Sequence, residues 1–482
     1  MTQPPSVQPA LAPPTAPSAV PPQAGPHSGV AGQSTPAPGQ PAAPARHTAW
    51  TENWRRLRAA ATTEPGRLRV IGAVLVVLIL TFGLLTSLQV TLRSSAADAV
   101  IGSSQPLSAD AAEIHRLLAD ANTTAASGFL AGGEEPRAVG ERYDDDIRQA
   151  AELITRAAAS GEGSKTARQQ LSTLNRELPV YTGLVEAARA NNRQGLPIGG
   201  AYLRYADERM RTTLLPAART LYETESARYQ RDHDEARSWP WQALLLGVLV
   251  LGALGWAQRR HYVRTNRVFN RGLLGATATV LVVLGWLVVG HGIAWARLGD
   301  AERDAGRSLQ ALNESLVAAL EARGDENMTL VARGAGAAYE ETYRESMLRL
   351  AGEKAQRPGR ALLEKAALLA DDETGRAAVD EALEQAREWN ERHAEVRELD
   401  NSGEYAAAVA KAIGTGESTG QAFDKVDAAL REAIRHEQGQ FTGAAESGRS
   451  ALTGLAVGTG LLTLLGAAGS VAGIGRRLAE YR

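Results

Sequence analysis

The chain has 482 residues, no cysteine, and 52 basic residues against 54 acidic ones. The absence of cysteine excludes disulfides and thiolate metal sites, and the near-neutral charge argues against nucleic acid as a partner. Because phenylalanine occurs only five times, helices packed through Ala and Leu are favoured over a β-sheet.

The N-terminal 69 residues have two parts. Residues 1–48 are rich in Pro and Ala, and the first 46 contain 13 of the 21 prolines and no acidic residue. Such a segment cannot bury enough apolar surface to fold, so we predict a disordered cytoplasmic tail. A solvated linker is the favoured interpretation, and a docking site on a polyproline stretch is the alternative. Residues 49–69 contain Trp and Arg and are predicted to form a basic juxtamembrane helix at the inner headgroup layer.

Four long apolar runs follow. The hydrocarbon core of a bilayer, about 30 Å thick, takes roughly 20 helical residues. The runs are predicted to span the membrane at 70–88, 240–257, 272–294 and 451–475. Soluble proteins rarely contain four such runs with arginines at one end, so buried core helices are a poor alternative. The chain is therefore predicted to be a multi-pass membrane protein, and the fourth run is the weakest of the four signals.

Arginine placement predicts the orientation. The segments before the first run, between the second and third, and after the fourth contain 14 basic and three acidic residues. The positive-inside rule therefore predicts that the N-terminal segment, the basic loop 258–271 and the C-terminal residues 476–482 are cytoplasmic. The two long acidic segments, 89–239 and 295–450, are then expected outside the cell membrane.

Both outer segments are predicted to be four-helix bundles. Ala, Leu, Glu and Arg recur in them at helical spacing. One clear apolar stripe consists of Leu203, Ala206, Met210, Leu214, Ala217 and Leu221. Up-down-up-down connectivity returns the chain to the membrane, as the topology requires. The predicted fold is thus an all-α membrane protein with four transmembrane helices and two duplicated extracytoplasmic four-helix bundles.

A short phrase occurs once in each outer segment. Residues 120–133 read DANTTAASGFLAGG and residues 325–336 read DENMTLVARGAG, which aligns Asn122 with Asn327. A bundle-facing asparagine needs partners for its amide and can set the register between helices. We therefore favour a packing role for both asparagines over direct contact with a ligand.

A second pair of phrases supports an internal repeat. YDDDIR, beginning at Tyr143, is echoed by YEETYR, beginning at Tyr339. The apolar runs recur at a similar offset, so we predict that span, bundle and span are duplicated. The candidate residues for bundle packing or signalling are Asn122, Asn327, Tyr143 and Tyr339.

None of the possible catalytic or metal motifs is convincing. The glycine-rich stretch 414–420 (GTGESTG) has no preceding strand and no lysine at phosphate-loop spacing, so it is predicted to be a surface loop. The acidic stretch 232–235 (DHDE) cannot converge on a metal, because neighbouring helical residues point in different directions. The same holds for Glu391, His393 and Glu395. We predict no enzymatic activity, no cofactor and no metal.

Two further features concern partners. The fourth run contains Gly454-xxx-Gly458 and Gly469-xxx-Gly473, spacings that permit close helix packing within the chain or in a homodimer. The inner loop supplies candidate contacts for a cytoplasmic partner, namely Arg259, Arg260, Arg264, Arg267 and Arg271. These arginines are equally well explained as topology determinants that rest on the anionic lipid bilayer.

Several phrases resemble the actinobacterial GlnX-type membrane proteins: DANTTAASGFLAGGEEP, RYDDDIRQA, LPVYTGLVEAARANNRQGLPIGGAYLRYA and MTLVARGAGAAYE. The resemblance covers roughly residues 69–480 and is most specific at 120–148, 180–216 and 325–344. It implies a four-span protein that couples an extracytoplasmic solute-binding lipoprotein, of the glutamine-binding type, to a cytoplasmic Ser/Thr kinase of the G type. The bundles also resemble the sensor domains of chemoreceptors and histidine kinases.

The expected function is non-enzymatic signal transduction across the membrane. By resemblance, the signal is amino-acid availability reported by the lipoprotein, and the effector is the kinase. Two alternatives stay open: a receptor whose bundles bind a small molecule directly, and a scaffold that holds partners at the membrane.

Overall fold

The computed structural model describes residues 64–133, 135–160, 164–265, 270–300, 306–352, 360–370, 372–452 and 454–479. The predicted tail 1–48 and the segment 49–63 lie outside this part, and 64–69 belong to the first described helix. The structure is 91% helical, with no strand in its described part, and four helices are long and apolar enough to cross a membrane. The all-α prediction is confirmed.

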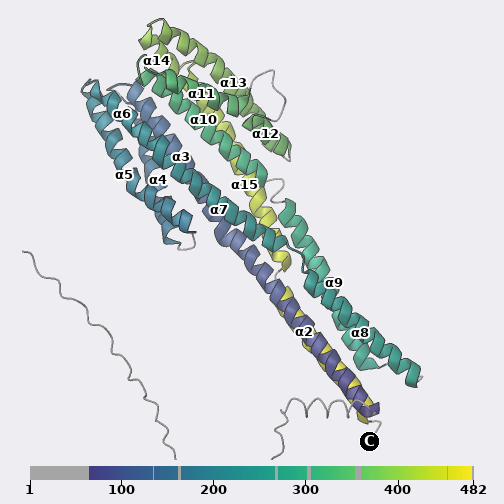
Figure 1. The fold of residues 1–482 in the computed structure, drawn as a ribbon. Coiled ribbons are helices and arrows are strands. Elements are labelled where there is room, and N and C mark those ends of the chain that lie inside the picture. Colours follow the sequence, from purple (N-terminus) through teal and green to yellow (C-terminus); the bar gives the residue numbers. More distant parts are fainter. Residues whose placement is uncertain are drawn as a thin grey trace, which may run out of the picture. The chain divides into compact units, whose positions relative to one another are not determined.

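The four apolar helices pack together through small residues. They are α2 (Glu64–Ala99), α8 (Trp241–Thr265), α9 (Arg271–Asp300) and α16 (Leu455–Ala479). Helix α16 packs against both α2 and α9, and Figure 1 shows it running alongside α2. A Cβ atom added to Gly272 would lie 2.5 Å from Cα of Gly473, so α9 and α16 touch backbone to backbone. Gly469 and Gly473 therefore serve packing within the chain.

The two residues of the other glycine pair, Gly454 and Gly458, have different roles. Gly458 faces the ring of Trp286, so it too permits close packing. Gly454 has a positive φ of 80° and no neighbour within 4 Å of an added Cβ atom. It lies between α15 and α16, where glycine tolerates a left-handed conformation that other residues rarely adopt.

Substituting Gly272 tests this helix contact. Gly272→Val should lower the free energy of unfolding by about 1–3 kcal/mol, because the backbone of α16 cannot move aside as a flexible side chain can. Thermal melting of the detergent-solubilised full chain measures the effect. Gly275→Val is the matched control, since nothing lies within 4 Å of an added Cβ atom there. Equal melting temperatures for the two variants would contradict the contact.

The first bundle contains four long helical rods. Its elements are α3 (Gln105–Leu130), α4 (Arg137–Ala159), α5 (Lys165–Arg193), α6 (Ile198–Arg209), η2 (Met210–Leu214) and α7 (Leu215–Arg237). The last three run on without a break and form the fourth rod. The predicted apolar stripe along this rod is buried, which confirms its orientation toward the core. Ser164 caps α5 by accepting a hydrogen bond from the amide of Ala167 at 3.0 Å.

The second bundle is less regular. Its elements are α10 (Arg307–Val331), α11 (Ala337–Ala351), α12 (Leu362–Leu369), α13 (Glu373–Asn401), α14 (Tyr405–Ile413) and α15 (Thr419–Leu452). The second rod is divided between α11 and α12, and the short helix α14 precedes the last rod, α15. The described part of this bundle is therefore less regular than four uninterrupted helices.

Two π-helical segments that the structure describes in full interrupt the long rods. One is η1 (Val100–Ser104) between α2 and α3, and the other is η2 between α6 and α7. Each precedes a turn that contains proline, Pro106 or Pro216. Proline lacks an N–H group and its ring clashes with the carbonyl four residues earlier, so widening the helix ahead of it relieves the conflict. The helix from Glu64 to Leu130 is consequently continuous, and the first span and the first rod of the bundle form one element (Figure 1).

Candidate functional site

The two bundles meet where α3 packs along α10, a contact that we call the seam. The hydroxyl of Thr123 donates to the carbonyl of Leu320 at 2.8 Å, and Nδ2 of Asn327 donates to Oγ of Ser127 at 2.8 Å. The two residues of each pair are 197 and 200 positions apart in the sequence, which is less than the separation between Asn122 and Asn327. The helices therefore face each other at a different offset from the one that the repeated phrase suggests.

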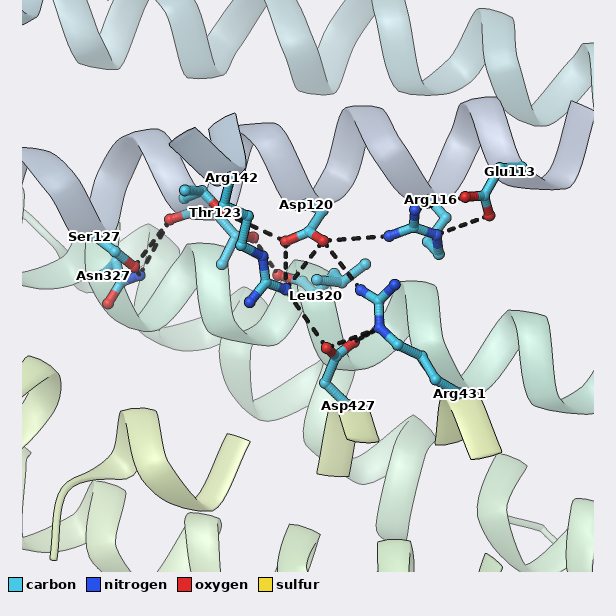
Figure 2. A network of polar contacts seen from close by, with 11 residues as sticks. Glu113, Arg116, Asp120, Thr123, Ser127, Arg142, Leu320, Asn327, Asp427 and Arg431 are labelled. Carbon is cyan, nitrogen blue, oxygen red and sulfur yellow. Dashed lines mark hydrogen bonds and ion pairs between the residues drawn. The ribbon is translucent and has the colours of Figure 1, made fainter. Parts of the chain in front are cut away.

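Asp120 is the centre of a polar network across the seam (Figure 2). Its side chain is only 2% exposed and contacts three guanidinium groups. Arg116, on the same helix, lies 3.2 Å away, Arg142 of α4 lies 2.8 Å away, and Arg431 of α15 in the second bundle lies 3.1 Å away. An ion pair thus joins the first helix of one bundle to the last helix of the other.

Two further carboxylates balance these arginines. Asp427 of α15 accepts from Nε of Arg431 at 2.9 Å and lies 3.5 Å from Arg142. Glu113 lies 2.6 Å from Arg116. Nearby Asp146 is buried, and burial, followed by the charge of Asp120, raises its pKa to about 7. The network is therefore closely matched in charge.

A second ion pair crosses the seam in the reverse sense. Asp325 of α10 pairs with Arg211 of η2, so the second bundle now supplies the carboxylate and the first the arginine. Asp325 is 1% exposed. The aspartate that opens each copy of the repeated phrase therefore reaches an arginine of the other bundle. The sequence contained this signal, but our prediction singled out the asparagines.

The two asparagines occupy different surroundings. Asn122 donates to Asp207 at 2.8 Å and accepts from the hydroxyl of Tyr181 at 3.3 Å, both within the first bundle. Asn327 crosses the seam to Ser127. Asn122 therefore joins helices within the first bundle, whereas Asn327 joins the two bundles.

The two tyrosines also differ. Tyr143 is buried, with the guanidinium of Arg189 lying 4.2 Å from the centre of its ring. Tyr339 is partly exposed, and Arg211 lies 5.7 Å from its ring centre. Tyr339 thus belongs to the seam, whereas Tyr143 belongs to the core of the first bundle.

A buried ionic cluster in the second bundle was missed in the sequence. His393 lies between two carboxylates, with Nδ1 2.9 Å from Glu326 and Nε2 3.1 Å from Glu340. Tyr343 stacks on the imidazole at 3.7 Å between ring centres. Burial lowers the pKa of His393, but the hydrogen bonds to both carboxylates outweigh burial and raise it above its ordinary value. The sequence prediction rightly separated His393 from Glu391 and Glu395, yet could not see its partners on other helices.

The loop arginines are only partly described. Helix α8 extends to Thr265 and α9 begins at Arg271, so residues 258–265 and residue 271 of the predicted loop are helical. Arg259 and Arg260 lie on this helix, with Arg260 5.3 Å from the ring of Trp256, and Arg271 begins α9. The side chain of Arg264 and all of Arg267 lie outside the described part of the chain.

Comparisons with known proteins locate the similarity in the first bundle. No curated protein and no solved structure matches the chain. Residues 96–234 match the sequence model of the actinobacterial sensor domain. The match begins near the end of α2 and ends within α7, so it contains Asp120, Asn122 and Arg211. The first bundle is thus similar to an actinobacterial sensor domain, which points to a sensing and non-catalytic role.

Proposed function

We propose that this chain is a non-enzymatic signal transducer of the cell membrane, with both termini in the cytoplasm. It relays an extracytoplasmic nutrient signal, amino-acid availability, to a cytoplasmic Ser/Thr kinase. A solute-binding lipoprotein delivers the signal to the outer bundles. The similarity to a sensor domain supports the sensing role, and the resemblance of the quoted phrases to GlnX-type proteins is the support for both partners.

The observation that carries the relay is the unbroken helix from Glu64 to Leu130. Two other connections between a bundle and an apolar helix contain a described break in the helix. One lies at residues 238–240, between α7 and α8, and the other lies at Gly454, between α15 and α16. A displacement of α3 at the seam must therefore move α2. Because α2 packs against α8 and α16, its movement changes the arrangement of the span helices at the inner face.

We propose that the seam is the element that adopts two arrangements. The pairs Asp120–Arg431 and Asp325–Arg211 hold the bundles together, and Arg431 and Arg211 are each about one third exposed. Such ion pairs can break and re-form with a small rotation of one body against another. An outer partner that binds one arrangement more tightly shifts the population toward it.

The inner loop is the proposed readout, and a double variant tests it. Arg264→Gln with Arg267→Gln should abolish the cytoplasmic output, because these arginines contact the effector, while Arg259, Arg260 and Arg271 retain the topology. The measurement compares phosphorylated cytoplasmic proteins after a shift from amino-acid-poor to amino-acid-rich medium. Cells with the variant should resemble cells without the chain.

Two controls accompany this test. Arg148→Gln with Arg435→Gln removes two exposed arginines from the bundles and should leave the output unchanged. Cysteines at Gly416 and Asn266 report the orientation, and a membrane-impermeant thiol reagent should label only the first in whole cells. Full output from the Arg264/Arg267 variant would move the readout to the tail or the C-terminus.

A further inference from the structure

A cavity of about 400 Å³ opens at the seam beside the second ion pair. Both bundles line it, through α3, α6, η2 and α7 on one side and α10 and α11 on the other. A second hollow of about 480 Å³ shares Asp207, Arg211 and Thr342 with it, so the two form one cleft. Ligand pockets of small molecules occupy roughly 300–1,000 Å³, which matches this size.

Two buried carboxylates in the cleft share one guanidinium. Asp325 pairs with Arg211, and Asp207 accepts from Asn122 at 2.8 Å. Both aspartates are almost fully buried, and Oδ2 of Asp325 has no hydrogen-bond partner among the described residues. A buried carboxylate oxygen without a partner is costly, and that cost is recovered when a donor arrives.

The pKa values of both aspartates are consistent with this deficit of positive charge. Burial raises the pKa of Asp325 to about 7, against the opposing effect of Arg211, and burial also raises the pKa of Asp207. The π-helical turn η2 carries Arg211, and such turns frequently occur at functional sites.

The remaining charges on the walls do not supply the missing cation. Arg349 lies 3.3 Å from Glu321, and Arg219 lies 2.9 Å from Glu223. Burial lowers the pKa of His115 to about 4, so its ring is neutral at physiological pH. The walls also contain Glu345 and, in the second hollow, Arg204 and Glu208, so three remaining arginines are matched by three remaining glutamates.

A metal ion is a poor fit for this position. The described residues include no group of three or more His, Cys, Asp or Glu arranged to hold one. Arg211 also lies against Asp325, where its charge repels a divalent cation more strongly than it repels a singly charged amine. A protonated amine, by contrast, needs only two or three hydrogen-bond acceptors and carries a single charge.

We propose that the cleft binds a small molecule through a protonated primary amine, held between Asp207 of the first bundle and Asp325 of the second. The amine belongs either to an amino acid or to an aliphatic polyamine. Because each bundle contributes one carboxylate, bound amine ties the bundles together at the seam. This consequence for signalling rests on the proposed function, whereas the binding itself does not.

Calorimetric titration of the full chain in detergent tests the proposal. The probes are putrescine, L-glutamine and N-acetyl-L-glutamine, whose amine is blocked. At least one of the first two should bind saturably, and the acetylated compound should not. Binding of putrescine alone assigns the cleft to polyamines, and binding of L-glutamine alone assigns it to amino acids. No saturable binding of either amine at millimolar concentration would overturn the proposal.

Three variants make the test specific. Asp325→Asn should weaken binding at least tenfold, while Asp207 stays in place near the charge of Arg211. Thr342→Phe, at a partly exposed position that lines both hollows, should block binding without touching either carboxylate. Asp145→Asn, in an exposed ion pair, is the matched control and should bind as the unmodified chain does. Unchanged affinity in both cleft variants would refute the site.

The outcome is separable from that of the loop variant. The titration contains no cytoplasmic partner, so a failure to bind refutes only the amine site. Loss of output in the Arg264/Arg267 variant, with binding retained, supports the relay and the site together.

Discussion

Glu326→Gln should destabilise the second bundle by about 3–5 kcal/mol, the cost typical of removing one partner from a buried ion pair. Glu326 is 1% exposed and pairs with Arg323, which is also buried. It further accepts from Nε1 of Trp389 at 3.1 Å and lies 2.9 Å from Nδ1 of His393. The neutral amide of glutamine leaves the charge of Arg323 without compensation. Its NH2 group is also a donor, and it would face the N–H donors of Trp389 and His393.

Thermal melting of the full chain in detergent measures this loss, with Glu432→Gln as the control. Glu432 forms an ion pair with Arg435 in which both side chains are more than 60% exposed. Exposed pairs contribute about 0–1 kcal/mol, so the control should melt close to the unmodified chain. If both variants melted alike, the buried cluster would have no stabilising role.

The pH dependence of the same melt identifies the contribution of His393. Its pKa is raised in the folded chain, so its stabilisation is complete below the ordinary histidine value of 6.5 and is lost as pH rises through the folded pKa. Burial opposes the shift in both cases, but Arg323 and His393 lower the pKa of Glu326, and His393, Arg397 and Arg344 lower that of Glu340. Their stabilisation is present above the ordinary value of 4.5 and is lost as pH falls further.

The cluster should therefore stabilise the fold most between about pH 4.5 and 6.5. Raising the pH from 6.5 to 9 should lower the melting temperature of the unmodified chain. His393→Gln should reduce this decline, and the difference between the two curves isolates His393 from other buried acids. Parallel curves would show that the imidazole does not titrate in this range.

Asp120→Asn should cost about 2–4 kcal/mol, somewhat less than Glu326→Gln. The substitution removes the carboxylate shared by three arginines, but Arg142 and Arg431 are each about one third exposed and keep Asp427. Water therefore screens part of the uncompensated charge. Melting of the full chain measures the loss, with the exposed Asp145→Asn as its control.

A double-mutant cycle shows whether the loss arises across the seam. Once Asp120 is neutral, Arg431→Gln should cost less than it does in the unmodified chain, because only the contact with Asp427 is then left to lose and the effects of Asp120 and Arg431 are not additive. The Asp120→Asn variant should also shift the basal cytoplasmic output, since it loosens the contact that positions α3. If the losses of stability in Asp120→Asn and Arg431→Gln simply added up in the double variant, Asp120 would stabilise only the first bundle and not the seam.

The sequence by itself determined the features that depend on local pattern. Apolar runs of about 20 residues predicted the four candidate span helices, since the thickness of a bilayer sets the length of apolar sequence needed to cross it. The helical spacing of the stripe from Leu203 to Leu221 predicted its buried face, because 3.6 residues per turn place these side chains on one side. Close packing at Gly469 and Gly473 followed from the absence of side chains.

The tertiary structure alone decided which polar residues meet. Asp120 and Arg431 lie 311 positions apart, and His393 meets Glu326 across 67 positions. Their contact depends on the axial offset and rotation of packed helices, which result from the fit of every side chain in both bundles. A shift of one residue along a helix turns a side chain by about 100°, from the seam to the solvent. The periodicity of one helix specifies its own buried face, whereas only the packed pair specifies the partner opposite each residue.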